Sequence, residues 1–80
     1  MLELLESLED KIQKGQDIDE IAEELSDAVE LACDEGELPY STKNEVLDLI
    51  GKINESYNYD SEDTTISTDL INLKELVNDL

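Results

Sequence analysis

The sequence predicts an all-α protein, a small antiparallel four-helix bundle that forms a single helical domain over residues 1–80. Three observations predict it. Apolar residues recur in four stretches with the ~100° rotation per residue of an amphipathic helix, and no stretch alternates as a strand does. A chain of 80 residues has room for one domain. Because each stretch carries one apolar stripe and the connections are short, neighbouring helices are expected to run antiparallel.

The first predicted helix occupies the N-terminal part of the chain and ends at Gly15. Lys11 and Lys14 precede this glycine, and cations in the last turn followed by glycine are typical of a helix C-terminus. The apolar residues cover about a third of the helix circumference, so one face is expected to be buried. That stripe consists of Met1, Leu4, Leu5, Leu8 and Ile12.

The second predicted helix begins near Asp17 and ends at Gly36. Asp17 stands three residues before Glu20, a spacing close to that of a capping box, in which the two side chains satisfy free N–H groups at the helix start. Its apolar stripe consists of Ile18, Ile21, Ala22, Leu25, Ala28, Val29, Ala32 and Cys33.

The third predicted helix follows a connection over residues 36–41 that contains Pro39, a residue that suits a connection better than a helix interior. Thr42 and Glu45 have capping-box spacing and predict the helix start. Gly51 lies beside the stripe and is expected to weaken the helix by about 1 kcal/mol relative to Ala. The stripe consists of Val46, Leu49, Ile50, Ile53 and Tyr57.

The fourth predicted helix follows residues 58–65, which are polar apart from Tyr59 and are expected to form a loop. Ser67 is the predicted N-cap, because Ile66 and Ile71 around it have the spacing of a hydrophobic staple. The stripe of this helix consists of Leu70, Leu73, Leu76, Val77 and Leu80.

The net charge narrows the possible partners. Asp and Glu number 23 against 5 Lys, with no Arg or His, which gives a formal charge of −18. Binding to nucleic acid or to an anionic membrane surface is not expected, because both need cationic side chains. Neither a membrane-spanning run nor a signal peptide is expected from the apolar pattern. A lone Cys33 cannot form an internal disulfide, so we expect a protein of the reducing cytoplasm.

Catalysis is not expected, and neither is a cofactor or a metal. The chain offers no His as a base near neutral pH and no Arg to hold a phosphate or a carboxylate. Asn58, Asp60 and Glu62 alternate as in a calcium-binding loop, but Asp63 stands where that loop needs a glycine. A solvated acidic loop is therefore predicted there. Cys33 is interpreted as a small apolar residue at the core rather than a reactive thiol.

The strongest functional pattern is an acidic face on the second helix. From Asp17 to Glu37 there are ten acids and no base. Like charges four residues apart destabilise a helix by a few tenths of a kcal/mol each, so the face costs stability. It predicts a surface for a cationic partner, although the acids could also serve solubility alone. Opposite the apolar stripe, this face consists of Glu20, Glu23, Glu24, Asp27, Glu30 and Asp34, with Leu31 in its middle as a possible apolar anchor.

A second acidic patch is predicted in the loop before the last helix. Asp60, Glu62 and Asp63 stand there beside Tyr57 and Tyr59, and tyrosine among charged residues is a favourable composition for a protein interface. The same pattern is equally compatible with Tyr57 closing the core. The sequence leaves open whether the second helix or this loop dominates a contact.

The back half of the chain resembles the immunity proteins related to that of colicin D. The resemblance rests on "VLDLIGKINESYNYD", a polar gap and "ISTDLINLKELVNDL", together with the earlier "KGQDIDEIAEEL". The chain differs from that group in its greater acidity and in its lack of Phe and Arg. The resemblance implies a small inhibitor of the nuclease domain of a bacteriocin or contact-dependent toxin, typically one that cleaves transfer RNA, with the contact at the loop acids and the tyrosines near them.

Elementary electrostatics agrees with that implication, because a nuclease that binds RNA phosphates presents a basic cleft that an acidic protein can occupy. We therefore expect a monomeric, non-enzymatic inhibitor of a basic protein. Two alternatives stay open. One is a phage or mobile-element mimic of nucleic acid that inhibits a DNA-binding or RNA-guided defence protein. The other is an acidic helical adaptor that binds through an apolar groove, although no Asp-Ser-Leu attachment motif opens a helix.

Overall fold

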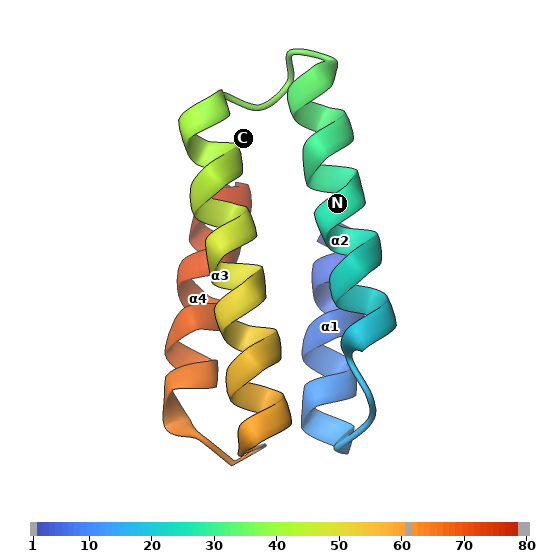
Figure 1. Ribbon diagram of the computed structural model, residues 1–80, viewed down its shortest axis with the longest axis vertical. Coiled ribbons are helices and arrows are strands. Elements are labelled where there is room, and N and C mark those ends of the chain that lie inside the picture. Colours follow the sequence, from blue (N-terminus) through green and yellow to red (C-terminus); the bar gives the residue numbers. More distant parts are fainter. Residues whose placement is uncertain (1, 61, 79–80) are drawn as a thin grey trace.

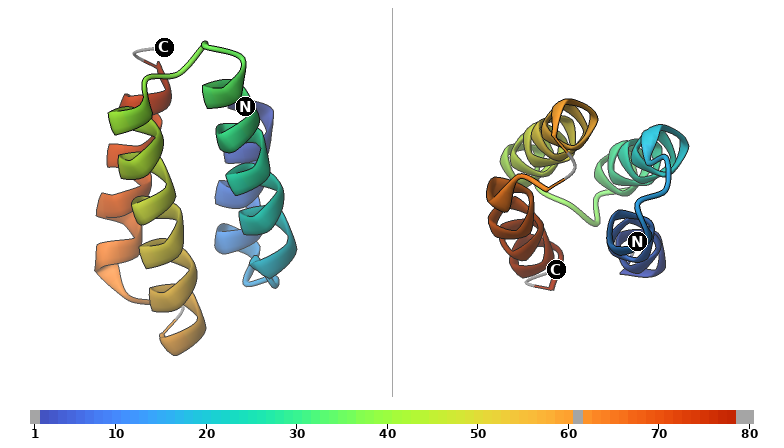
Figure 2. Two further views of the ribbon diagram at one scale, coloured as in Figure 1. Left: turned by 45° about the horizontal axis from the view of Figure 1, so that its top comes forward. Right: turned by 90° about the horizontal axis from the view of Figure 1, so that it is seen from below.

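Four antiparallel helices form the bundle in the computed structural model, which describes residues 2–60 and 62–78. Each helix runs opposite to its neighbours in the chain (Figure 1), and the end-on view in Figure 2 places the four helices around one central core. The all-α prediction is confirmed, and the described residues contain no strand. The helices are α1 (Leu2–Lys14), α2 (Asp19–Asp34), α3 (Tyr40–Tyr59) and α4 (Thr64–Asn78).

The predicted glycine ends of the first two helices are confirmed. Gly15 and Gly36 have φ angles of 70° and 80°, which glycine adopts without the penalty that a Cβ brings. After α1, the N–H of Gln16 donates to the carbonyl of Lys11 at 2.9 Å. After α2, the N–H of Glu37 donates to the carbonyl of Ala32 at the same distance. Both ends are therefore Schellman motifs, which satisfy carbonyls that the helix leaves free.

The predicted capping box at the start of α2 is wrong. The helix begins at Asp19, and Ile18 occupies the N-cap position without a side-chain capping bond. Asp17 instead accepts a 3.0 Å hydrogen bond from the N–H of Asp19, which fixes the turn before the helix. Ile18 is fully buried. The helix therefore begins without a side-chain cap, directly after a residue held in the core.

The predicted start of α3 at Thr42 is also wrong, because the helix begins at Tyr40, with Pro39 at the N-cap. The carbonyl of Pro39 accepts a 2.9 Å hydrogen bond from the N–H of Lys43, which is the first bond of the helix. Proline lacks an N–H and has a fixed φ, so it fits a helix start. Thr42 and Glu45 therefore lie inside α3.

The connection between α3 and α4 is shorter than predicted, because α3 continues through Tyr59 and α4 begins at Thr64. Asp63 accepts a 3.0 Å hydrogen bond from the N–H of Thr65, so this residue caps α4, and the prediction of Ser67 as the cap is wrong. The predicted staple of Ile66 and Ile71 is wrong as well. Ile66 is buried within the first turn of α4, whereas Ile71 is 57% exposed.

One hydrophobic core runs through the bundle, and the predicted stripes supply it. Leu4, Ile12, Cys33, Leu49 and Leu76 are half-buried against it, and the predicted core positions Met1 and Leu80 lie outside the described residues. Leu38, in the connection between α2 and α3, adds a core residue that no stripe predicts. The buried residues are Leu5, Leu8, Ile18, Ile21, Ala22, Leu25, Val29, Ala32, Leu38, Val46, Ile50, Ile53, Tyr57, Ile66, Leu70, Leu73 and Val77.

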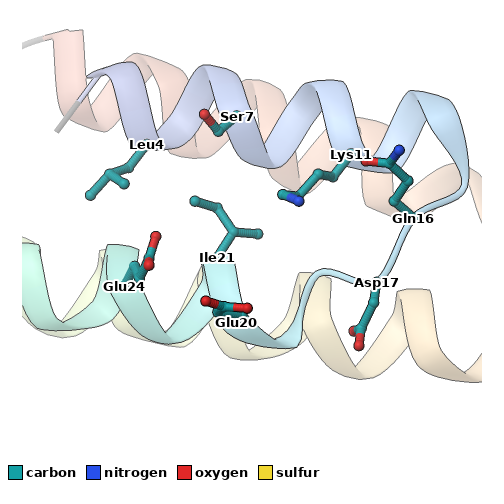
Figure 3. A pocket seen from close by; sticks show the side chains of 8 residues that line it. All are labelled: Leu4, Ser7, Lys11, Gln16, Asp17, Glu20, Ile21 and Glu24. Carbon is teal, nitrogen blue, oxygen red and sulfur yellow. The ribbon is translucent and has the colours of Figure 1, made fainter.

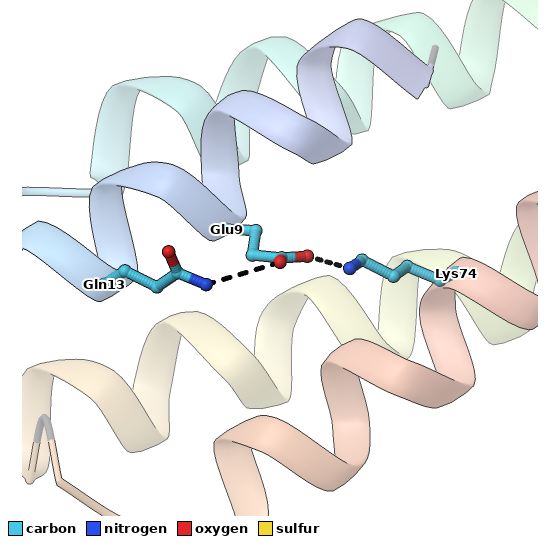
Figure 4. Close-up of polar contacts among 3 residues, drawn as sticks. All are labelled: Glu9, Gln13 and Lys74. Atoms are coloured by element: carbon cyan, nitrogen blue, oxygen red, sulfur yellow. Dashed lines mark hydrogen bonds and ion pairs between the residues drawn. The ribbon is translucent and has the colours of Figure 1, made fainter.

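The contact between α1 and α4, here called the α1–α4 seam, closes the bundle. α3 packs most extensively on α4 and α2, whereas α1 and α4 pack least extensively of the neighbouring pairs. Figure 4 shows the polar contact at this seam, an ion pair between Lys74 of α4 and Glu9 of α1. Gln13 also donates a 3.4 Å hydrogen bond to the Glu9 carboxylate.

Candidate protein-binding surface

The acidic face predicted on the second helix is exposed on α2. Its six carboxylates lie opposite buried residues such as Leu25 and Val29, as an amphipathic helix requires. Within residues 2–60 and 62–78, none of the six makes a hydrogen bond or an ion pair with another residue. Ion pairs occur instead on α1, α3 and the α1–α4 seam, between Lys14 and Asp10, Lys52 and Asp48, and Lys74 and Glu9. Among the described residues, the six acids of α2 thus have no partner in an ion pair.

Packing divides this face into two flanks. Glu20 and Glu24 lie toward α1, where they line a groove between the two helices. Glu23 and Glu30 lie toward α3 and line a second groove. The ~100° rotation per residue places Asp27 and Asp34 between the flanks. Four of the six acids that the sequence assigns to one face thus border two grooves of different composition.

The groove between α1 and α2 has a volume of about 660 Å³ and contains a cation of its own. Figure 3 shows the Lys11 side chain extending from α1 into the space that Glu20 and Glu24 border from α2. Leu4 and Ile21 supply apolar surface to the same groove. Lys11 offsets part of the negative potential here, so this flank is the less attractive one for an incoming cation.

The groove between α2 and α3 has a volume of about 390 Å³ and has no lysine among its lining residues. Asp19, Glu23 and Glu30 form its acidic wall, whereas the rest of the lining is neutral. The sequence did not predict Asp19 as a site residue. Asp19 lies at the end of the acidic face, and it lines the groove only because α3 packs beside α2. The remaining lining residues are Ala22, Ser26, Leu47, Ile50, Gly51 and Asn54.

Two of the predicted apolar contact residues are available at the surface. Leu31 is 58% exposed in the middle of the acidic face, and Tyr59 is 92% exposed at the end of α3. A large apolar side chain surrounded by carboxylates can anchor a partner while the charges set its orientation. Tyr40 is also exposed, but the amine of Lys43 lies 4.6 Å from its ring centroid and gives that surface a cation.

Tyr57 closes the core, which is one of the two roles that the sequence allowed for it. Its side chain is 8% exposed, and its hydroxyl donates a 2.7 Å hydrogen bond to the backbone carbonyl of Gln16. The side chain is therefore committed to the bundle and offers almost no surface to a partner. Tyr59, which is exposed, belongs to the candidate surface, and Tyr57 does not.

The acids of the loop before α4 are partly engaged in local structure. Asp60 accepts a 3.0 Å hydrogen bond from the N–H of Glu62, and Asp63 caps α4. Asp60 and Glu62 are exposed, whereas Asp63 is half-buried. The loop thus contributes two exposed carboxylates to the candidate surface, and that of Asp60 also accepts the local hydrogen bond.

The two acidic patches lie at the same end of the bundle. Asn58, near the end of α3, donates a 3.1 Å hydrogen bond to the carboxylate of Asp19, the first residue of α2. The loop that follows α3 therefore lies near the start of the acidic face (Figure 1). Because these two segments are adjacent, the acidic face of α2 and the exposed loop acids are together called the extended surface.

A scan of family models and searches of curated proteins and solved structures find no match to this chain. The described residues include no helix long and apolar enough to cross a membrane. They also bring together no group of three or more His, Cys, Asp or Glu side chains suited to a metal ion. The described surface combines exposed carboxylates, which attract cations, with exposed apolar side chains among them.

Proposed function

We propose that the protein is an immunity-type inhibitor that binds the basic active-site cleft of a nuclease toxin by imitating a polyanion. The observation that carries the proposal is the exposed acidic face of α2, whose six carboxylates form no ion pair with the described residues. Such a face costs helix stability, and a cationic partner relieves that cost on binding. The partner class is a toxin domain that cleaves RNA, typically transfer RNA, and the inhibitor acts in the cytoplasm as a monomer without enzymatic activity of its own.

The extended surface supports this mode of binding. A nuclease cleft holds several cations along the path of the RNA backbone, and the acids of α2 follow one helix for its whole length. Asp60 and Glu62 continue the negative potential past the end of the helix. Leu31 and Tyr59 supply apolar contacts that a partner must desolvate. Charge steering should make association fast at low salt.

The test is inhibition of purified RNA-cleaving toxin domains at two salt concentrations. Partners are first captured from lysate and named by mass spectrometry, and the recovered nuclease is then assayed for RNA cleavage. We expect inhibition at about 50 mM salt to weaken at least tenfold by about 200 mM salt, since screening removes the attraction between exposed charges. Inhibition that hardly changes with salt would contradict polyanion mimicry. Recovery of a DNA-binding or RNA-guided defence protein would instead support the alternative function, a phage or mobile-element mimic of nucleic acid.

A further inference from the structure

α1 is the least firmly packed helix of the bundle. It packs less extensively on its two neighbours than any other helix does. Of its 13 residues, all of which the structure describes, only Leu5 and Leu8 are buried, whereas each of the other three helices buries at least four residues. Because a short helix in a protein is stabilised mainly by the apolar face that it buries, α1 is held in place less strongly than its neighbours are.

Grooves lie along both sides of α1. The groove between α1 and α2 has a volume of about 660 Å³, and Figure 3 shows Leu4 and Ile21 pointing into it from opposite sides. Two further grooves, of about 220 and 320 Å³, lie along the α1–α4 seam, and Ile12 and Leu70 line the smaller one from opposite helices. Side chains that border an open groove make fewer contacts than those of a close-packed interior. Neither side of α1 is therefore tightly interlocked with its neighbour.

Few polar contacts hold α1 against the other helices. Among the described residues, Lys74 and Glu9 form the only ion pair between α1 and another helix, and both side chains are partly exposed, so solvent weakens their attraction. The hydrogen bond from the Tyr57 hydroxyl to the Gln16 carbonyl lies beyond the end of α1. It anchors the connection to α2, and α1 can move away without breaking it.

We propose that α1 is a detachable helix, which undocks as a unit while α2, α3 and α4 stay packed together. Once undocked, α1 unfolds, because an isolated helix of 13 residues is marginal in water. The open form exposes Ile21 of α2 and Leu70 of α4, and it requires less free energy than unfolding of the whole bundle. The protein thus has an apolar surface that is covered and uncovered by its own first helix. The inference goes beyond nuclease inhibition and does not depend on it.

The test is hydrogen exchange of backbone amides in the full-length protein, labelled with ¹⁵N and followed by NMR under conditions in which reclosing is faster than exchange. After correction for intrinsic rates, we expect the amides of Leu8 and Ile12 to exchange at least about tenfold faster than those of Ile53 and Leu73, because partial opening is enough to expose them. Leu8 and Ile12 should be protected equally, since α1 opens as a unit.

Two isoleucine-to-valine variants locate the opening, and each shortens one side chain by one carbon. Ile50→Val changes a buried residue between α2 and α3, in a contact that undocking of α1 leaves intact. Exchange in α3 and α4 should therefore become about fivefold faster, while exchange in α1 stays unchanged. Ile12→Val weakens a contact that undocking breaks, so exchange in α1, α3 and α4 should become faster by one common factor. Circular dichroism checks that both variants keep their helices.

Three results would overturn the inference. Equal protection of α1 and α3 in the wild type would show that α1 opens only when the whole bundle unfolds. Equal acceleration of α1 and α3 in Ile50→Val would show the same. Protection that rises steadily from Leu8 to Ile12 would show fraying from the N-terminus instead of undocking. A lack of nuclease inhibition, measured separately with the toxin domain, would contradict the proposed function and leave these exchange rates as they are.

Discussion

The hydroxyl of Tyr57 donates a 2.7 Å hydrogen bond to the backbone carbonyl of Gln16, which joins the end of α3 to the connection between α1 and α2. The two residues are 41 positions apart in the chain. The bond satisfies a carbonyl just beyond the α1 Schellman motif and holds the tyrosine ring in the core. It also fixes the start of α2 near the end of α3, where the acidic surface begins.

Removal of this hydroxyl should measurably destabilise the bundle. We expect Tyr57→Phe to lower the free energy of unfolding by about 1 kcal/mol, the usual net contribution of such a hydrogen bond. Urea denaturation followed by circular dichroism measures it. Tyr59→Phe removes the same group from a side chain that is 92% exposed and serves as the control. Equal effects of the two substitutions would contradict a specific role for the Tyr57 bond.

Alanine should have opposite effects at two glycines. At Gly51 the backbone is helical and the added Cβ has free space, so Gly51→Ala should raise the free energy of unfolding by about 1 kcal/mol. At Gly36 the φ angle is 80°, so Gly36→Ala should lower it by about 1 kcal/mol. Chemical denaturation of both variants tests the pair. A loss of stability in Gly51→Ala would mean that something occupies the space above that residue in solution.

Salt should stabilise the protein. A charge of −18 on 80 residues produces repulsion within the folded state, and added ions screen it. We expect the melting temperature to rise by several degrees between about 10 and about 200 mM NaCl, as measured by circular dichroism. A melting temperature that stays flat or falls over this range would show that repulsion does not limit stability.

Charge reversal on α2 should weaken partner binding without unfolding the protein. We expect Glu23, Asp27 and Glu30 changed together to Lys to reduce affinity for the nuclease at least a hundredfold, because attraction becomes repulsion at the contact. The control triple is Glu3, Glu45 and Glu75 to Lys, which changes the net charge equally at exposed positions outside the acidic face. Calorimetric titration compares the two.

Equal losses in the two triple variants would show that net charge, rather than the α2 face, governs binding. If binding survives the α2 change but is lost when Asp60 and Glu62 are changed to Lys, the loop is the dominant contact. Both results can be read only where circular dichroism shows that the helices are intact.

Two contributions of Asp63 to the start of α4, its capping hydrogen bond and its negative charge, can be separated by mutation. Asp63→Ala removes both the acceptor for the Thr65 N–H and the carboxylate, and should lower the free energy of unfolding by about 1 kcal/mol. Asp63→Asn removes the charge but keeps a good capping oxygen, so its stability should stay close to that of the wild type. Urea denaturation distinguishes them. A similar loss in both variants would mean that the charge, not the hydrogen bond, stabilises the start of α4.

Helix ends were predictable where one residue decides them, and helix starts were not. Gly15 and Gly36 end their helices because the backbone there needs a positive φ, a requirement that the residue type reveals. The capping spacings at Asp17 and Thr42 predicted wrong starts. In a chain this rich in Glu, a suitable residue three positions before an acid is common, so the spacing carries little information. The observed starts instead follow Ile18, which is buried, and Pro39, whose φ is −60°.

The sequence by itself determined the all-α class, the four apolar stripes and the exposure of the acidic face, because helical periodicity relates each residue to its own helix axis. Only the tertiary structure decided that Tyr57 closes the core, that the α2 acids border two grooves, and that the loop lies beside the start of α2. The physical reason is that these features depend on which helix packs against each flank of another. Long-range packing determines which helices become neighbours, and the spacing of apolar residues within one helix carries no information about that packing.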